Sequence, residues 1–207
     1  MSLHTQHSEN FEVYFCTVTC YKWLPLFEQA QAYRSVYRWF DHLKDDGCLL
    51  LGYVIMPNHF HVLLYPTHSG TSLNKIVGDG KRFMAYDIVN SLKKSGSDSL
   101  LKTLADGVEP KEKLKGKKHQ VFKISFDARK CFNENMIEQK LLYMHHNPVQ
   151  GKWSLAEDFT KYVHSSAAFY ELGEVGKTPM FHYKDLGKHE VSVSPASTSS
   201  LSDVDGE

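Results

Sequence analysis

Gly52-Tyr53-Val54-Ile55-Met56-Pro57-Asn58-His59-Phe60-His61-Val62-Leu63-Leu64-Tyr65-Pro66 is the stretch that decides the fold of this sequence. Two apolar runs, residues 49–56 and 60–65, flank the breaker Pro57-Asn58, a pattern that predicts two strands joined by a tight turn. Side chains alternate between the two faces of a strand, so His59 and His61 should share a face. Two neutral imidazoles placed in this way can share one divalent metal ion. For the pair alone, a hairpin with two half-exposed histidines is the simpler interpretation.

The composition indicates one packed domain. The chain has 207 residues, of which 42% are hydrophobic and 13% aromatic, enough for a single core. No apolar run approaches the roughly 18 residues of a membrane span, and the polar first residues lack the core of a signal peptide. The four cysteines form no C-x-x-C pair. We therefore expect buried thiols, no membrane partner and a reducing cytoplasmic location.

The charge is balanced overall but unevenly distributed. The formal net charge is zero, which does not by itself predict nucleic-acid binding. Between residues 111 and 130, however, basic residues outnumber acidic ones. The candidate DNA-binding residues in this strip are Lys111, Lys113, Lys115, Lys117, Lys118 and Lys123. Such a strip can bind phosphates locally, and it can equally be a solvated loop.

The hydrophobic pattern and the positions of helix-breaking residues predict the other secondary-structure elements in the first half of the chain. Residues 11–21 are typical of a first strand, and residues 26–43 of an amphipathic helix. A second helix should run from Ser72 to about Leu92, weakened or kinked by Gly78 and Gly80. We expect a mobile loop over residues 90–118, with a short helical piece near residues 100–104.

The later part of the chain should supply one more strand and one more helix. The alternation over residues 121–126 predicts the fourth strand. Asn133 is a plausible cap for a helix over residues 134–146, which Pro148 would end. As domains, we expect a flexible N-terminus over residues 1–10, one folded domain over residues 11–175, and a disordered tail over residues 176–207.

The order strand, helix, strand, strand, helix, strand is typical of a ferredoxin-like or RRM-like α+β sandwich. Two helices would cover one face of an antiparallel sheet. The other face would be open to a ligand or to the late helix at residues 134–146. The sequence therefore predicts an α+β fold in which that late helix carries Tyr143.

Tyr143 and Asn147 occupy positions i and i+4 of the late helix, so they lie on one helical face. The run Met56-Pro57-Asn58-His59-Phe60-His61, followed by Tyr143-x-His-x-Asn-Pro-Val, resembles the REP-associated tyrosine transposases. These belong to the IS200-like, single-tyrosine HUH class, named for its His–hydrophobe–His motif. Residues 162–170 also resemble the closing segment of that family.

The resemblance implies metal-dependent cutting and rejoining of single-stranded or hairpin DNA. His59 and His61 would bind Mg²⁺ or Mn²⁺, with Asn147 as the third ligand, because an amide oxygen suits a hard cation. Tyr143 would attack the phosphate and form a 5′-phosphotyrosine. A phenol is mostly protonated at neutral pH and needs activation, and the sequence does not show by which group.

The residues leave several alternatives open. The chain could instead be a non-catalytic single-strand-binding module, with Tyr14, Tyr53 or Phe60 stacking bases. A structural zinc site is a poor alternative, because no cysteine accompanies the histidines at ligand spacing. A homodimer stays open beside a monomer, and Tyr143 could serve the histidine pair of its own chain or of a second copy. We expect His145 and His146 to be solvated.

Overall fold

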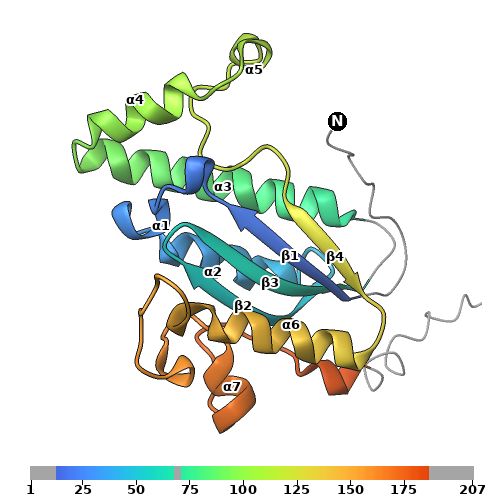
Figure 1. Cartoon of the computed structure of the whole chain (residues 1–207). Helices are drawn as coiled ribbons and strands as arrows, with labels where there is room; N and C mark the ends of the chain where they lie inside the picture. Colours follow the sequence, from blue (N-terminus) through green and yellow to red (C-terminus); the bar gives the residue numbers. More distant parts are fainter. Residues whose placement is uncertain (1–12, 68–70, 187–207) are drawn as a thin grey trace, which may run out of the picture.

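The computed structural model describes residues 13–67 and 71–186, so the expectations for residues 1–10 and 187–207 lie outside the described residues. The strands are β1 (Val13–Thr19), β2 (Cys48–Met56), β3 (His59–Pro66) and β4 (Asp127–Cys131). They form one antiparallel sheet in the order β2-β3-β1-β4 (Figure 1). Between the strands lie helices in the order of a split βαβ repeat. The predicted ferredoxin-like α+β sandwich is confirmed.

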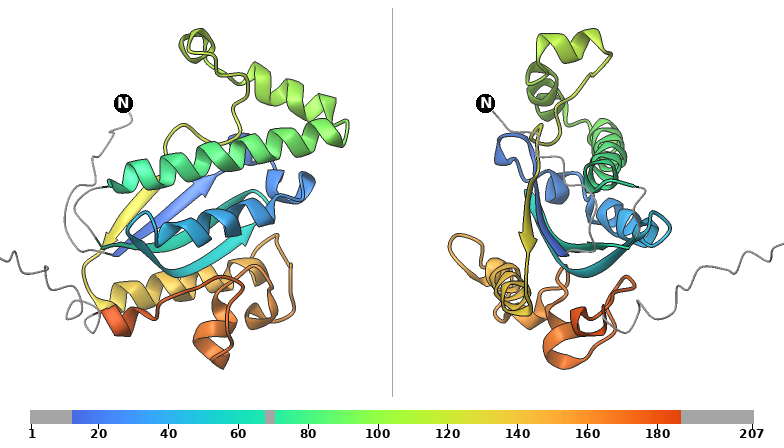
Figure 2. Two further views of the ribbon diagram at one scale, coloured as in Figure 1. Left: turned by 180° about the vertical axis from the view of Figure 1, so that it is seen from behind. Right: turned by 90° about the vertical axis from the view of Figure 1, so that its right-hand side faces the viewer.

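Each face of the sheet has its own hydrophobic core. On the first face, α2 (Tyr33–Leu43) and α3 (Leu73–Lys94) pack over the even-numbered side chains of β1 and β3. On the second face, α6 (Glu134–His146) packs over the odd-numbered side chains of the same strands. Figure 2 shows the sheet edge-on with these helices on opposite sides. The histidine pair is odd-numbered, so it faces the side of α6.

Residues 26–43 form two helices instead of the single helix that the sequence predicts. The first, α1, spans Leu26–Gln29, and α2 begins at Tyr33. Between them Gln31 adopts a φ of 51°, and the amide of Ala32 donates a hydrogen bond to the carbonyl of Phe27 at 2.8 Å. The turn lets Leu26 and Phe27 enter the core. Tertiary packing thus overrides a helical pattern that contains no breaker.

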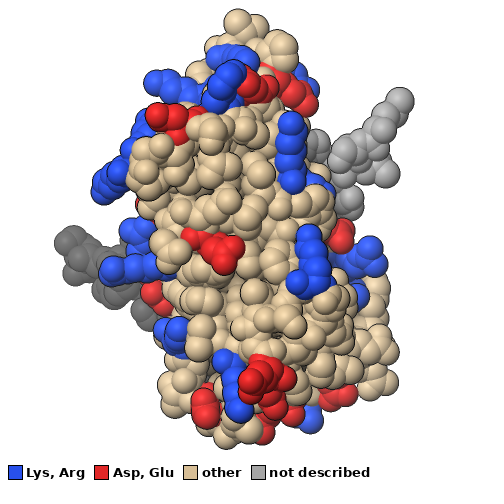
Figure 3. Space-filling view, turned by 60° about the vertical axis from the view of Figure 1, so that its left-hand side comes forward, with Lys and Arg blue, Asp and Glu red and all other residues tan. Residues whose placement is uncertain are grey.

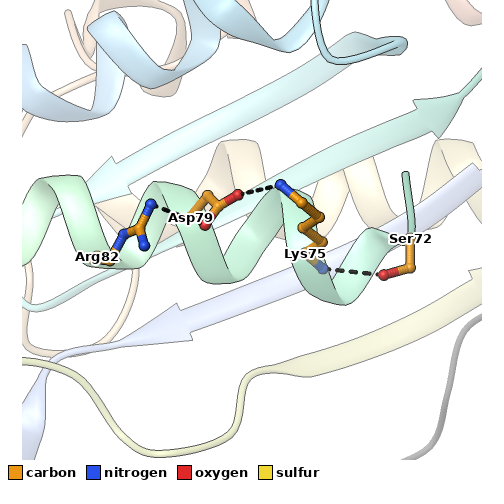
Figure 4. A network of polar contacts seen from close by, with 4 residues as sticks. All are labelled: Ser72, Lys75, Asp79 and Arg82. Atoms are coloured by element: carbon orange, nitrogen blue, oxygen red, sulfur yellow. Dashed lines mark hydrogen bonds and ion pairs between the residues drawn. The ribbon is translucent and has the colours of Figure 1, made fainter. Parts of the chain in front are cut away.

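The helix α3 (Leu73–Lys94) is continuous and begins directly after Ser72, where the sequence predicts its start. The Ser72 side chain accepts a hydrogen bond from the Lys75 amide at its start. Asp79 then bridges Lys75 at 2.8 Å and Arg82 at 3.3 Å on the solvent side (Figure 4), contacts that each support a helix modestly. Helical residues continue through both glycines, so the predicted weakening does not interrupt the helix.

The two glycines of α3 should respond oppositely to alanine. A Cβ at Gly80 would lie 2.5 Å from Nε1 of the Trp39 indole, whereas a Cβ at Gly78 would meet nothing within 4 Å. We expect Gly80→Ala to destabilise the fold by about 1–3 kcal/mol, because a rigid ring must move. Gly78→Ala should stabilise it by roughly 0.5–1 kcal/mol through helix propensity. Urea unfolding of both variants tests this, and shifts in the same direction would contradict it.

The stretch predicted as a mobile loop is mostly helical. The helix α3 extends to Lys94, and α4 (Asp98–Asp106) and α5 (Pro110–Leu114) follow. Leu104 is buried, and Leu100 and Leu101 pack against the first core. The prediction was wrong because the polar residues of this stretch form the solvent side of amphipathic helices. The short helical piece near residues 100–104 lies inside α4.

The fourth strand lies later than predicted. Val121 and Phe122 are buried, and Phe122 makes an isolated bridge with Cys20. The chain then bulges out over residues 124–126 and pairs again with β1 as β4. Val121 and Phe122, which suggested a strand, therefore belong to the segment that leads into β4, and their side chains fix that segment to the core. The true strand is polar because it is an exposed edge, which carries little hydrophobic signal.

After α6 the chain runs along the free edge of β2. Its short elements are η2 (Asn147–Val149), η3 (Phe159–Lys161), α7 (Ala167–Leu172) and η4 (Tyr183–Asp185), and η1 (Tyr21–Trp23) precedes α1. The amides of Ile55 and Phe181 donate to the carbonyls of His164 and Leu50, respectively. Residues 176–186, predicted to begin a disordered tail, are therefore ordered, because they supply this edge and bury Tyr183.

All four cysteines are buried free thiols, as the sequence predicts. Within residues 13–67 and 71–186, no helix combines the length and apolar character needed to span a membrane.

Candidate active site

The two histidines lie side by side on the second face of the sheet. His59 and His61 begin β3, and their ring centroids are 4.8 Å apart with the rings nearly perpendicular. Both side chains are buried. Phe15, on the neighbouring β1 strand, stacks on His61 at 5.1 Å. The prediction that both imidazoles share one face is confirmed, but they are buried and not half-exposed.

Each histidine is oriented by one polar neighbour. The Nδ1 of His59 lies 2.7 Å from Oδ1 of Asn58, while Nδ2 of Asn58 donates to the carbonyl of Trp23 at 3.2 Å. Because a carbonyl oxygen only accepts, Nδ1 of His59 must carry the proton, and its Nε2 keeps a lone pair. Thr17 Oγ1 lies 2.9 Å from Nδ1 of His61. Such neighbours fix the rings of metal-binding histidines.

Both imidazoles are held in the neutral form. Burial, with a smaller contribution from the charge of Lys152, lowers the pKa of His59 to about 4. Burial likewise lowers the pKa of His61 to about 3, with smaller contributions from His59 and from Lys140. A neutral imidazole is the form that binds a metal ion. At neutral pH no proton competes for either ring.

Tyr143 projects from α6 over this pair. The Asn133 side chain accepts a hydrogen bond from the Met136 amide and caps the helix, as predicted. Tyr143 is 53% exposed, and its ring centroid lies 5.4 Å from that of His61 and 6.0 Å from that of Phe15. A half-exposed phenol thus stands against the buried histidine within a single chain.

A glycine lets α6 approach the sheet closely. At Gly52, beside a register shift in the β2–β3 pairing, a Cβ would lie 2.7 Å from Leu141 and 2.8 Å from Met144. These two residues belong to the buried side of α6, together with Ile137 and His145. With them seated against β2, the neighbouring position 143 is directed along the sheet toward His61.

The buried polar atoms fit a divalent cation. Within the described residues, three buried side-chain nitrogens lack a hydrogen-bond partner, and two of them are Nε2 of His61 and Nδ2 of Asn147. Asn147 ends α6 one turn after Tyr143. Turning its amide over would offer the carbonyl oxygen, which suits Mg²⁺ or Mn²⁺. In the described part of the chain, no group of three or more His, Cys, Asp or Glu side chains is placed to hold a metal ion, so a third protein ligand beside the two histidines would have to be another residue type, such as the Asn147 amide.

The predicted lysine strip divides into two parts. Lys123 lies near the histidines, because its Nζ is 4.5 Å from the ring centroid of Trp23, which in turn contacts His59 at 5.6 Å. The other five, from Lys111 to Lys118, lie on α5 and the loop after it, at the opposite end of the molecule from α6 (Figure 1). Lys111 and Lys115 are paired with glutamates there. Figure 3 shows basic and acidic groups adjoining at this end.

Sequence reasoning missed the residues that support the site. Asn58 was visible as part of the motif but had no assigned role, and nothing in the sequence predicts that Thr17 pairs with His61 across the strands. Lys140, whose Nζ lies 5.2 Å from the ring centroid of Phe15, sits one turn before Tyr143 and could have been found from helical spacing. No pattern in the sequence indicates that Trp23 lies beside the histidine pair.

Two further expectations were wrong. Tyr14, Tyr53 and Phe60, the candidate stacking residues of a binding module, are buried in the first core beneath α2 and α3. Tyr14 and Phe60 are even-numbered residues of β1 and β3, and Tyr53 of β2 lies opposite Val62 of β3, so all three side chains point to the first face of the sheet. His145 is not solvated: it is buried and lies 2.8 Å from the Ser166 hydroxyl, where it ties α6 to the segment along β2.

The strand order and the helix on the second face define a ferredoxin-like sandwich with an added C-terminal helical layer. Among solved structures, the chain is similar to a REP-associated tyrosine transposase that was solved bound to a REP hairpin. The identity is 15%, the alignment covers 87% of this chain and 95% of that one, and the TM-score is 0.53. The two proteins share a fold.

A looser likeness links the chain to a protein from Deinococcus radiodurans R1 that was assigned as a transposase. The identity is 14%, the alignment covers 70% of this chain and 97% of that chain, and the TM-score is 0.34, too low to bear on the fold. No protein-family model matches the sequence, and the search of curated proteins gives no significant match.

Proposed function

We propose that this protein is a transposase-type enzyme that cuts and rejoins single-stranded DNA through a covalent bond to Tyr143. The observation that carries the proposal is the half-exposed Tyr143 ring lying against His61, whose buried Nε2 has no partner among the described residues. The fold shared with a REP-associated tyrosine transposase supports it. His59, His61 and Asn147 would hold Mg²⁺ or Mn²⁺, which when bound supplies charge to polarise a phosphate oxygen.

In the proposed reaction one phosphorus atom exchanges an oxygen substituent twice, first in cleavage and then in rejoining. The phenol oxygen of Tyr143 forms a bond to phosphorus as the bond from phosphorus to the 3′ oxygen breaks. The phenol proton passes to solvent, and the leaving 3′ oxygen takes up a proton as a hydroxyl. The product is a 5′-phosphotyrosine, from which an attacking 3′-hydroxyl later regenerates the phosphodiester and the phenol. No external energy source is required.

The residues around Tyr143 suit this role. Phe15 and His61 flank the ring and restrict its orientation, which places the hydroxyl for attack. Lys140 comes close enough to lower the pKa of buried His61, so it brings positive charge to where a phosphate would lie. A single chain supplies all of these groups, so the proposal has Tyr143 serve its own histidine pair.

The test is metal-dependent cleavage. Full-length protein is incubated with Mn²⁺ and a labelled oligonucleotide that carries a hairpin and single-stranded flanks. We expect an SDS-resistant protein–DNA adduct that EDTA prevents, because no cation then offsets the charge on the phosphate. Cleavage that leaves no adduct, or an adduct that forms equally well in EDTA, would contradict the proposal.

The lysines of α5 and its following loop would contact DNA beyond the active site. We expect the triple variant Lys115→Gln/Lys117→Gln/Lys118→Gln to weaken binding of a long hairpin-bearing strand, and to reduce the salt slope of binding by about 2. These lysines lie at the other end of the molecule from α6, so binding of a short oligonucleotide should be unchanged. Fluorescence anisotropy at several salt concentrations measures both. An unchanged slope with the long strand would show that these lysines are only a solvated surface.

A further inference from the structure

We propose that Trp23 and Lys123 form a platform that holds one nucleotide of single-stranded DNA, with its base stacked on the indole, beside the histidine pair. This inference rests on the proposed function and adds the contact that would position the strand. Sequence reasoning did not assign Trp23 to any site, and it placed Lys123 only in a broad basic strip.

The Trp23 ring is presented to solvent at the edge of the candidate site. It is 50% exposed, although an indole is a large apolar surface that proteins usually cover. Its ring contacts that of His59 edge-on, at 5.6 Å between centroids and 77° between planes. A base stacked on this ring would therefore lie next to the first histidine.

The backbone under Trp23 is held in an unfavourable conformation. Lys22 and Trp23 have φ values of 51° and 59°, a region that residues other than glycine rarely adopt. Hydrogen bonds enforce it: the Trp23 amide donates to Cys20, and the Trp23 carbonyl accepts from Asn58. Backbone strain of this kind collects at functional sites. The same Asn58 orients His59, so the platform and the histidine share one support.

Lys123 supplies the charge for the adjoining phosphate. Its backbone is fixed from two sides, since its amide donates to the Thr19 carbonyl at 2.9 Å and its carbonyl accepts from Nζ of Lys81 at 2.9 Å. Its side chain is exposed and rests with Nζ 4.5 Å from the indole centroid. A base can take this place on the ring while the ammonium turns to the phosphate.

Substitutions of Trp23 and of Lys123 should change DNA binding in different ways. The probe is a fluorescein-labelled oligothymidylate of about 12 nucleotides, measured by anisotropy in EDTA so that no cleavage occurs. We expect Trp23→Ala to bind about 10-fold more weakly at every salt concentration, because stacking does not depend on salt. Lys123→Gln should reduce the salt slope by about 0.7, the effect of one phosphate contact on a single strand.

Phe83→Ala is the matched control. Phe83 is 60% exposed and carries Arg82 over its ring at 5.2 Å, but it lies on α3, which covers the first face of the sheet. It should bind like the wild-type protein. The platform is overturned if Trp23→Ala keeps wild-type affinity, if Phe83→Ala loses as much, or if the wild-type protein does not bind the probe.

The adduct assay separates this inference from the proposed function. If Trp23→Ala binds the probe as well as the wild-type protein does, and the wild-type protein forms a metal-dependent adduct, the platform is contradicted and the proposed enzymatic function is supported. Binding that depends on Trp23, without an adduct in the wild-type protein under any metal, would support the platform and count against the enzyme.

Discussion

Tyr143→Phe is expected to abolish the covalent protein–DNA adduct while leaving the fold and DNA binding intact. The substitution removes one oxygen atom and keeps a ring of the same shape, and that ring is half exposed against Phe15 and His61. Unfolding free energy should therefore change by less than about 0.5 kcal/mol, as for other surface substitutions. Without the hydroxyl no nucleophile remains at this position, and the adduct should fall to background. A denaturing gel of labelled oligonucleotides, followed by peptide mapping, measures it.

Tyr162→Phe is the control for this experiment. Tyr162 is buried and its hydroxyl donates to the Ile55 carbonyl at 2.8 Å, so its loss should cost about 1 kcal/mol of stability and leave the adduct in place. Duplex DNA should be a poor substrate for the wild-type protein, because the attacked phosphate needs a flexible backbone. The assignment fails if the adduct persists in Tyr143→Phe or maps to Tyr162.

The double variant His59→Ala/His61→Ala should lose Mn²⁺ binding and, with it, adduct formation. Both rings are neutral at physiological pH because burial lowers each pKa, and His61 Nε2 has no partner among the described residues. Removing both proposed ligands would leave only the Asn147 amide, which would not retain the ion alone. Isothermal titration calorimetry with Mn²⁺ is the measurement, and circular dichroism verifies that the variant is folded.

Two single variants make that result specific. Asn147→Ala should weaken Mn²⁺ affinity without abolishing it, since the imidazoles remain. His164→Ala removes a histidine that stacks on Tyr33 at 4.0 Å between centroids, away from the pair, and its Mn²⁺ affinity should match the wild type. Equal Mn²⁺ affinity in the wild-type protein and the double variant would contradict a metal site at His59 and His61.

The features that follow local rules could be predicted from the sequence. The period of two along a strand placed His59 and His61 on one face, and the Pro57-Asn58 turn set the hairpin. The Asn133 cap and the position of Pro148 gave α6 with its observed bounds. These depend on a few neighbouring residues and on steric limits that hold in any fold.

The features that depend on distant parts of the chain could not be predicted. The opposition of Thr17 and His61 comes from the register between strands far apart in sequence. The strand β4 lacks an apolar pattern because it is an edge, and the break before α2 follows from packing of Phe27. The approach of α6 to the sheet depends on Gly52, whose lack of a side chain matters only once Leu141 and Met144 lie over it.

The position of α6 in the chain has a consequence for the timing of synthesis. The ribosome makes the chain from its N-terminus, and domains fold as their segments emerge. Both histidines precede Tyr143 by the whole length of α3, α4, α5 and β4. The segment that ties α6 in place through Ser166 and His145 emerges later still. An incomplete chain that ends before residue 143 thus carries the histidine pair without the tyrosine, and under the proposed function it could not form a covalent bond to DNA.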